Sequence, residues 1–252
     1  MKFTLKIILF VGIFSLIFFG LHDSDFYNKK VILADLGGIP WLYASIGTLF
    51  SILAGFIIQK EWENWNSLVD AVGGEVNTLR EMWLWSRYLP AENGEIFHNS
   101  IKIYLEEMSG DGLQKSEQEI VSDRIEASMA KLNAVMFAMF QNQPSIAANG
   151  FNFFTKLIEK RTERIRFSSH HVPPSIKRII FLATALMICL SLFIGVKNIW
   201  LDYTYTMSVS MLAYVIYLVI DDLDHPLSPG GWHLTAKSYQ KLLERISAYK
   251  KE

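Results

Sequence analysis

Residues 39–58, IPWLYASIGTLFSILAGFII, contain no charged side chain over 20 positions. A helix rises about 1.5 Å per residue, so this run is long enough to cross the roughly 30 Å hydrocarbon core of a bilayer. Three further apolar runs, at residues 7–21, 179–201 and 203–220, approach or reach the same length. The sequence therefore predicts four transmembrane helices, arranged along the chain as two pairs.

The distribution of charge predicts how these helices are oriented. The formal net charge is only -1, so the total does not indicate a nucleic-acid partner. Basic residues instead gather before the third run, with two more before the first: Lys156, Lys160, Arg161, Arg164, Arg166, Lys177 and Arg178, then Lys2 and Lys6. By the positive-inside rule, both termini and the central segment are expected in the cytoplasm, and the chain in a plasma (inner) membrane.

The first apolar run also fits a second interpretation. A short basic start followed by an apolar stretch is typical of a secretory signal peptide. No Ala-x-Ala cleavage site follows residues 7–21, and an even number of spans keeps the basic segments on one side. We therefore expect this run to be retained as a membrane helix. The single cysteine, Cys189, excludes an intrachain disulfide and a thiolate metal cluster.

Between the two pairs the apolar residues narrow to stripes at helical spacing. Residues 62–83 predict a helix that continues from the second span as far as Pro90, with Gly73-Gly74 as a weak point. A shorter helix is expected at residues 95–108, followed by a turn at 109–112.

Further helices are expected beyond this turn. Ser116 and Glu119 fit a capping box at the start of the next helix. Residues 141–150 are expected to form a loop before a helix at 151–166. Residues 221–232, rich in Asp, Pro and Gly, predict irregular structure before a last amphipathic helix.

The predicted fold class is all-α, because no segment of consequence has the two-residue period of a strand. The expected domains are a first transmembrane pair at 1–58, a cytoplasmic helical domain at 59–177, a second transmembrane pair at 178–220 and a cytoplasmic tail at 221–252. No phosphate loop, serine elbow or paired catalytic residues were found, so an enzyme is not expected. His170 and His171 point about 100° apart on a helix, and adjacent histidines of this kind rarely share a metal.

Small and apolar residues follow two adjacent faces of the second span. Gly47, Ser51 and Gly55 recur every four residues and would let another helix approach closely. The adjacent face carries Ser45, Thr48, Ile52 and Phe56. If several copies surrounded an axis, this face would form a narrow apolar constriction that gates by dewetting. Lipid contact and packing within the chain are the alternatives.

Two charged groups have both ordinary and functional interpretations. Asp221, Asp222 and Asp224 follow the last span and offer oxygen ligands to Ca²⁺, although their spacing is not that of an EF-hand. Solvated turn residues or interhelical salt bridges are the favoured interpretation. The basic group Lys160, Arg161, Arg164 and Arg166 either sets topology and contacts anionic lipids or concentrates anions near a pore.

The order of the predicted helices and four segments of the sequence resemble those of a known protein family. The segments are residues 62–90 with Glu75 in the middle, Tyr104 followed by two glutamates, residues 164–174, and Leu223-Asp224-His225-Pro226. In this order they resemble the bestrophin-like domain family of bacterial membrane proteins. The family usually has Phe after the proline, where this chain has Leu227.

A more distant likeness links the chain to the bestrophins themselves. Gly55-Phe56, followed nine residues later by Trp65, is similar to the bestrophin pore helix and the tryptophan-rich stretch after it. Bestrophins are pentameric channels, mostly for anions, with an apolar neck and, in animals, a Ca²⁺ site at the acidic group. The resemblance thus implies a homo-oligomer, expected to be a pentamer, that conducts small inorganic ions past Thr48, Ile52 and Phe56. A membrane-anchored scaffold or sensor, whose cytoplasmic helices bind a partner, is the alternative.

Overall fold

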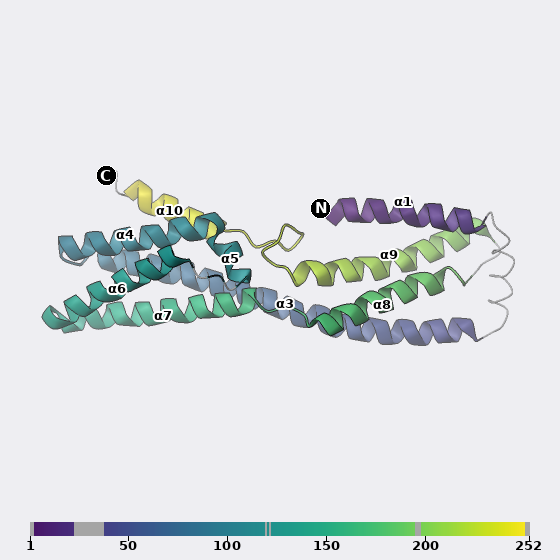
Figure 1. Ribbon diagram of the computed structural model, residues 1–252, viewed down its shortest axis with the longest axis horizontal. Coiled ribbons are helices and arrows are strands. Elements are labelled where there is room, and N and C mark those ends of the chain that lie inside the picture. Colours follow the sequence, from purple (N-terminus) through teal and green to yellow (C-terminus); the bar gives the residue numbers. More distant parts are fainter. Residues whose placement is uncertain (1–2, 23–37, 119, 121, 195–197, 250–252) are drawn as a thin grey trace. The chain divides into compact units, whose positions relative to one another are not determined.

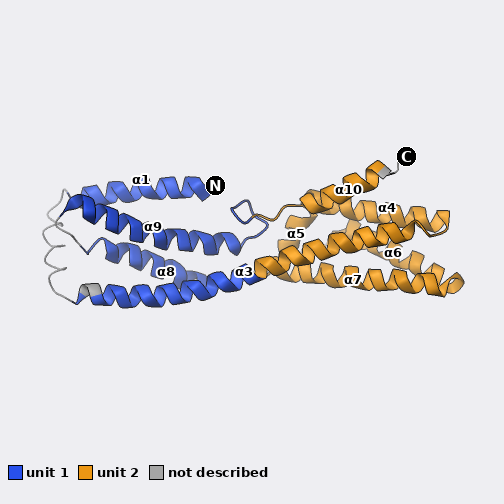
Figure 2. Cartoon of the chain, turned by 180° about the vertical axis from the view of Figure 1, so that it is seen from behind, with its two compact units in different colours: residues 1–63, 171–232 blue, residues 64–170, 233–252 orange. Residues whose placement is uncertain are grey.

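The computed structural model describes residues 3–22, 38–118, 120, 122–194 and 198–249, and every regular element in these ranges is a helix (Figure 1). The predicted all-α fold is therefore confirmed. The chain divides into two compact units (Figure 2). Unit 1 contains Met1–Glu63 and His171–Trp232, and unit 2 contains Asn64–His170 and His233–Glu252. The last helix belongs to unit 2 in this division.

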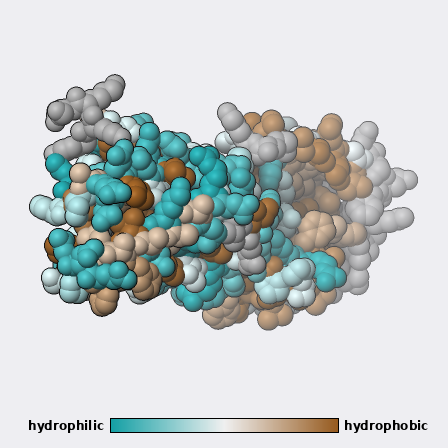
Figure 3. All heavy atoms as spheres, turned by 60° about the vertical axis from the view of Figure 1, so that its left-hand side comes forward, coloured by the Kyte–Doolittle hydropathy of each residue, from teal (hydrophilic) through white to brown (hydrophobic). Residues whose placement is uncertain are grey.

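Unit 1 holds all four apolar runs. Their helices are α1 (Phe3–His22), the first part of α3 (Ile39–Ser86), α8 (Pro174–Ser191) and α9 (Ile199–Leu223). The third run was predicted to continue through residue 201, but α8 ends at Ser191 and residues 199–201 begin α9. Each of the four helices is long and apolar enough to cross a membrane, which confirms the four predicted membrane helices. Many large hydrophobic side chains are exposed on this unit, whereas hydrophilic ones predominate on the visible face of unit 2 (Figure 3). The residues between α1 and α3, at 23–37, lie outside the described ranges.

The four membrane helices share apolar and polar contacts. Tyr43, Phe50, Ala54 and Ile57 of α3 form a core with residues of α8 and α9, including Ile180, Met187 and Ala213. The α1 helix packs against α9, where the Phe10 and Tyr214 rings stack with centroids 4.3 Å apart. This packing makes α1 an integral part of unit 1.

Unit 2 is a helical bundle built on the second part of α3. Its other helices are α4 (Ala91–Glu107), a π-helical turn (Met108–Gly112), α5 (Leu113–Glu117), α6 (Asp123–Asn142), α7 (Pro144–Ser168) and α10 (Lys237–Tyr249). The α3 helix is not interrupted at Gly73-Gly74. A Cβ at Gly74 would lie 2.8 Å from Lys160 Cδ, so this glycine lets the Lys160 stem of α7 lie close to α3.

Three predicted boundaries were wrong. Ser116 does not cap a helix, because it lies within α5 and its hydroxyl donates to the Gly112 carbonyl at 2.9 Å; α6 begins later, with Ser122 as its N-cap. Residues 141–150 are not a loop, because α7 starts at Pro144, where a proline needs no amide partner. The α9 helix also extends through Leu223, so irregular structure begins only after it.

Candidate functional site

The predicted neck face of α3 points away from the core of unit 1. Ile52 is 54% exposed and Phe56 is 69% exposed, and Thr48 is also exposed. The Thr48 hydroxyl donates to the Ala44 carbonyl at 2.9 Å, so its only donor is used within the helix. The described part of the chain does not cover this face, which excludes packing within that part as its explanation.

The small-residue stripe divides into two environments. A Cβ at Gly47 would lie 3.3 Å from Met187 Cε, so this glycine packs against α8 within the chain. A Cβ at Gly55 would meet nothing within 4 Å. Ser51 is exposed and donates to the Gly47 carbonyl at 2.8 Å. Only the Ser51 and Gly55 part of the stripe is therefore open to a neighbouring helix.

The three tail aspartates contact three different sets of partners. Asp221 Oδ2 lies 3.4 Å from Lys6 Nζ of α1. Asp222 Oδ2 accepts the backbone N–H groups of Gly231, at 2.7 Å, and Trp232, at 3.0 Å. A Cβ at Gly230 would lie 1.7 Å from Asp222 Oδ1, so this loop requires glycine there. These contacts spread the predicted Ca²⁺ ligands over three local structures, and Ca²⁺ binding by this group stays a prediction.

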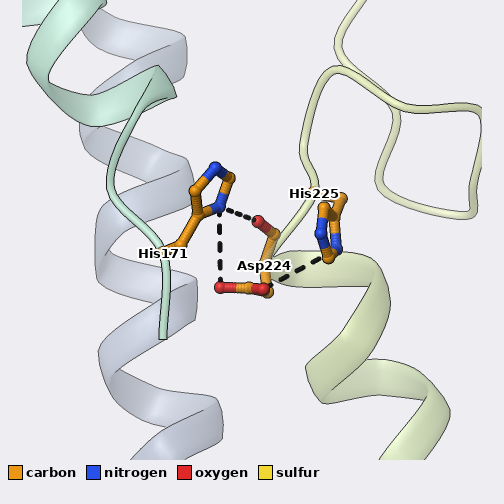
Figure 4. Close-up of side chains that lie close together, drawn as sticks. All are labelled: His171, Asp224 and His225. Atoms are coloured by element: carbon orange, nitrogen blue, oxygen red, sulfur yellow. Dashed lines mark hydrogen bonds and ion pairs between the residues drawn. The ribbon is translucent and has the colours of Figure 1, made fainter. Parts of the chain in front are cut away.

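Asp224 joins the end of α9 to the segment that precedes α8. Its carboxylate is fully buried, with Oδ1 accepting the Val172 backbone N–H at 2.5 Å and Oδ2 paired with the Lys177 ammonium. Two imidazoles flank it: His171 Nδ1 lies 3.8 Å from Oδ1, and His225 Nδ1 lies 3.6 Å from Oδ2 (Figure 4). One ligand atom from each of these three residues lies within 4.8 Å of the others. The described structure thus gathers two imidazoles and a carboxylate at one point.

A second buried carboxylate belongs to this region of unit 1. Glu61 follows the apolar part of α3 and is 3% exposed, and its Oε2 has no hydrogen-bond partner among the described atoms. Burial, followed by the negative charge of Asp224, raises the pKa of Glu61 to about 7, while Lys60 and Lys177 act in the opposite direction. Burial, more than any neighbouring charge, therefore favours the protonated form of Glu61.

Arg164, from the predicted anion-attracting group, is instead buried in the core of unit 2. Its Nε donates to Glu75 Oε2 at 2.5 Å, and it also hydrogen-bonds the Ser116 hydroxyl. Tyr104 donates to the other oxygen of Glu75. Burial lowers the pKa of Arg164, but the charge and hydrogen bond of Glu75, together with Tyr239 and Tyr104, outweigh it and raise that pKa above its ordinary value. This closed network is structural, and the charge of Arg164 is compensated where it lies.

The other three members of that basic group lie nearer the surface. Lys160 Nζ pairs with Glu163 at 2.8 Å, and Arg161 pairs with Glu126. The Arg166 guanidinium lies 4.5 Å from the centroid of the Phe167 ring. Carboxylates therefore balance two of these three charges locally, and the attraction of anions by the group stays a prediction.

Sequence reasoning missed both polar centres. His171 was considered only with its neighbour His170, whereas the structure pairs it with His225, 54 positions along the chain. Glu75 and Arg164 are 89 positions apart, and no periodicity links them. The useful signals were the polar residues in otherwise apolar helical stripes and the position of His225 directly after Asp224.

Comparisons with known proteins agree with the fold. No curated protein matches the chain in sequence. A crystal structure of a single-substitution variant of a bacterial bestrophin homologue from Klebsiella pneumoniae matches with a TM-score of 0.73 and 13% identity, covering 98% of this chain and 100% of that one. A second variant of a bestrophin homologue from the same organism gives a TM-score of 0.71 and 11% identity, covering 90% of this chain and 98% of that one. These likenesses show a shared fold.

The sequence itself identifies the family. The model of the Bestrophin-like domain matches residues 39–229, which is most of the chain and includes three of the four membrane helices. The expected family resemblance is thereby confirmed. This membrane protein belongs to the Bestrophin-like domain family.

Proposed function

We propose that the chain is one subunit of a homo-oligomeric ion channel, a pentamer selective for small inorganic anions. The observation that carries the proposal is the exposed face of α3, where Thr48, Ile52 and Phe56 lie outside the core of unit 1. Family membership supports a channel function, and the solved structures with this fold are described as bestrophin homologues.

The chemistry of this face fits a gate. The Ser45 and Thr48 hydroxyls donate to carbonyls one turn earlier, so the face offers few free polar groups to an ion. When α3 helices surround an axis, Ile52 and Phe56 form apolar rings from which water is readily expelled. The pore then conducts little until it widens or becomes more hydrophilic. The open stretch at Ser51 and Gly55 allows neighbouring subunits to approach.

The proposed setting is a plasma (inner) membrane, crossed four times, with both termini and unit 2 in the cytoplasm. The clustering of basic residues before α8 supports this orientation. Lipids, other copies of the chain and the permeating ions are the proposed partners. Neither a nucleic acid nor an enzymatic activity is part of the proposal.

Ion flux through reconstituted vesicles tests the proposal. The double variant Ile52→Ala/Phe56→Ala should raise chloride flux about tenfold or more over wild type, because smaller side chains widen the apolar constriction. Leu16→Ala is the matched control, since Leu16 is an exposed apolar residue on α1 and is not part of the proposed neck.

Oligomer size must stay the same in wild type, double variant and control, as measured by mass photometry in detergent. A monomeric wild type would contradict the proposal. So would a folded, ring-shaped oligomer that carries no flux in either wild type or the double variant. In both cases the chain would be better described as a membrane-anchored scaffold or sensor.

A further inference from the structure

We propose that His171, Asp224 and His225 form a binding site for a divalent transition-metal ion of the zinc type. All three residues belong to unit 1, at the junction of the segment before α8 with the end of α9 (Figure 4). The site is separate from the proposed neck on α3, and the proposal does not depend on ion conduction.

The distances suit a small tetrahedral ion. Ligand bonds of about 2.0–2.1 Å place neighbouring ligand atoms of a tetrahedral site about 3.3 Å apart. In the structure the two imidazole nitrogens lie 3.8 Å and 3.6 Å from the Asp224 oxygens that they face. Each of these nitrogens also hydrogen-bonds a backbone carbonyl, that of Asp224 for His171 at 2.8 Å and that of Asp221 for His225 at 2.9 Å, so both imidazoles would exchange these bonds for the ion. The three ligand atoms lie within 4.8 Å of one another and would draw closer together around it.

The ligand types favour zinc over calcium. Imidazole nitrogen is a preferred ligand of zinc and related transition metals, whereas Ca²⁺ prefers six to eight oxygen atoms. Here two of the three groups are imidazoles. Asp221 and Asp222, which would supply further oxygens, are occupied by Lys6 and by backbone N–H groups.

Two buried carboxylates lie in this region of unit 1. Asp224 is fully buried, and Glu61 nearby has a buried oxygen without a hydrogen-bond partner. The charges of these two carboxylates repel each other, and Lys60 and Lys177 act against this repulsion. A divalent cation at Asp224 would relieve this repulsion.

Lys177 acts as the competitor for the ion. Its ammonium now pairs with Asp224 Oδ2, an oxygen to which His225 also lies close. The side chain is partly exposed and has a long flexible stem, so the ammonium can move into water when a metal arrives. Removing this charge should therefore strengthen metal binding, which a purely structural role for the cluster does not predict.

Calorimetric titration of the metal-depleted full-length protein with zinc chloride tests the site, and Co²⁺ absorption reports the ligands. Wild type should bind one ion per chain. His171→Ala and His225→Ala should each weaken binding by about tenfold or more, as loss of a ligand normally does. Lys177→Met should tighten binding severalfold, and the adjacent His170→Ala should leave it unchanged.

Equal weakening by His170→Ala and His171→Ala would show nonspecific binding to surface histidines and would overturn the proposal. An unchanged zinc affinity in folded His225→Ala would also overturn it, as would displacement of bound Co²⁺ by equimolar Ca²⁺. Folding is checked by the helical signal in circular dichroism, and His225→Gln replaces His225→Ala if the alanine variant does not fold.

Discussion

Two fully buried carboxylates, Glu75 in unit 2 and Asp224 in unit 1, are compensated in different ways. The partner of Glu75 is Arg164, whose side chain is only 2% exposed. Asp224 instead faces Lys177, His171 and His225, whose side chains are 36%, 36% and 40% exposed. Glu75 and its charged partner are both shielded from solvent, whereas the charged partners of Asp224 are in contact with solvent.

This difference separates a structural centre from a candidate binding site. Around Glu75, both carboxylate oxygens have donors, and Arg164 and Tyr104 are themselves buried. No further ligand can enter without breaking that network. Around Asp224, the charged partners are partly exposed and can be hydrated when they turn outward, so an incoming cation can replace them at the carboxylate. A buried charge with exposed partners is therefore the more useful place to look for a ligand.

The largest expected effect is at Glu75, whose charged partner is buried. Arg164→Met leaves the Glu75 carboxylate buried without its cation, and we expect the free energy of unfolding to fall by about 3–5 kcal/mol. Urea unfolding followed by tryptophan fluorescence measures this change. Arg166→Met is the control and should cost less than about 1 kcal/mol, since Arg166 is exposed. Similar losses of unfolding free energy in Arg164→Met and Arg166→Met would show that the buried pair with Glu75 has no special structural role.

Substitution of Asp224, whose charged partners are partly exposed, should destabilise the protein less. Asp224→Asn keeps an oxygen for the Val172 N–H but removes the charge that pairs with Lys177. We expect a loss of about 1–2 kcal/mol, because the exposed partners regain water. The same unfolding experiment, performed with a chelator present, gives the value. A loss as large as that of Arg164→Met would show that Asp224, like Glu75, has a structural role, and would contradict the distinction between them.

Asp221→Asn provides the comparison within the tail. Its partner Lys6 lies at the surface, so the free energy of unfolding should change by less than about 0.5 kcal/mol. Calcium added to wild type should not raise the unfolding midpoint if the aspartates serve the local contacts described. A midpoint that rises at micromolar Ca²⁺ and no longer does so in Asp221→Asn would instead establish calcium binding by the tail.

A labelling experiment tests the proposed orientation of the chain in the membrane. Single cysteines are introduced into a Cys189→Ser background and treated with an impermeant reagent outside intact cells. Asn198→Cys, at the N-cap of α9, should be labelled, and Lys115→Cys, in α5 of unit 2, should not. Strong labelling at residue 115 would reverse the proposed orientation.

The sequence predicted the membrane helices well, because their length and apolar character are local properties of the chain. The apolar stripe on α3 beyond residue 60 was also predicted correctly, because its three- and four-residue spacing follows one face of a helix. Ser116 shows where local rules fail. Its pattern fits a cap, but the hydroxyl is used by Gly112 and Arg164, and Arg164 is 48 positions away.

The site was predicted only in part for the same reason. Thr48, Ile52 and Phe56 share a face because of helical spacing, and the structure leaves that face open. The grouping of His171 with Asp224 and His225 depends instead on how the segment before α8 meets the end of α9. A single sequence contains no local signal for such a contact.

The central claim is that the exposed α3 face lines an ion pathway. The most direct test is the current through single Phe56→Cys channels in a planar bilayer. In the Cys189→Ser background, a cationic thiol reagent at Phe56→Cys should raise the chloride current severalfold, because it makes the apolar ring hydrophilic and attracts anions. An anionic reagent should raise it much less, and Leu16→Cys should respond to neither. An unchanged current at Phe56→Cys, with mass spectrometry showing complete modification, would contradict the account.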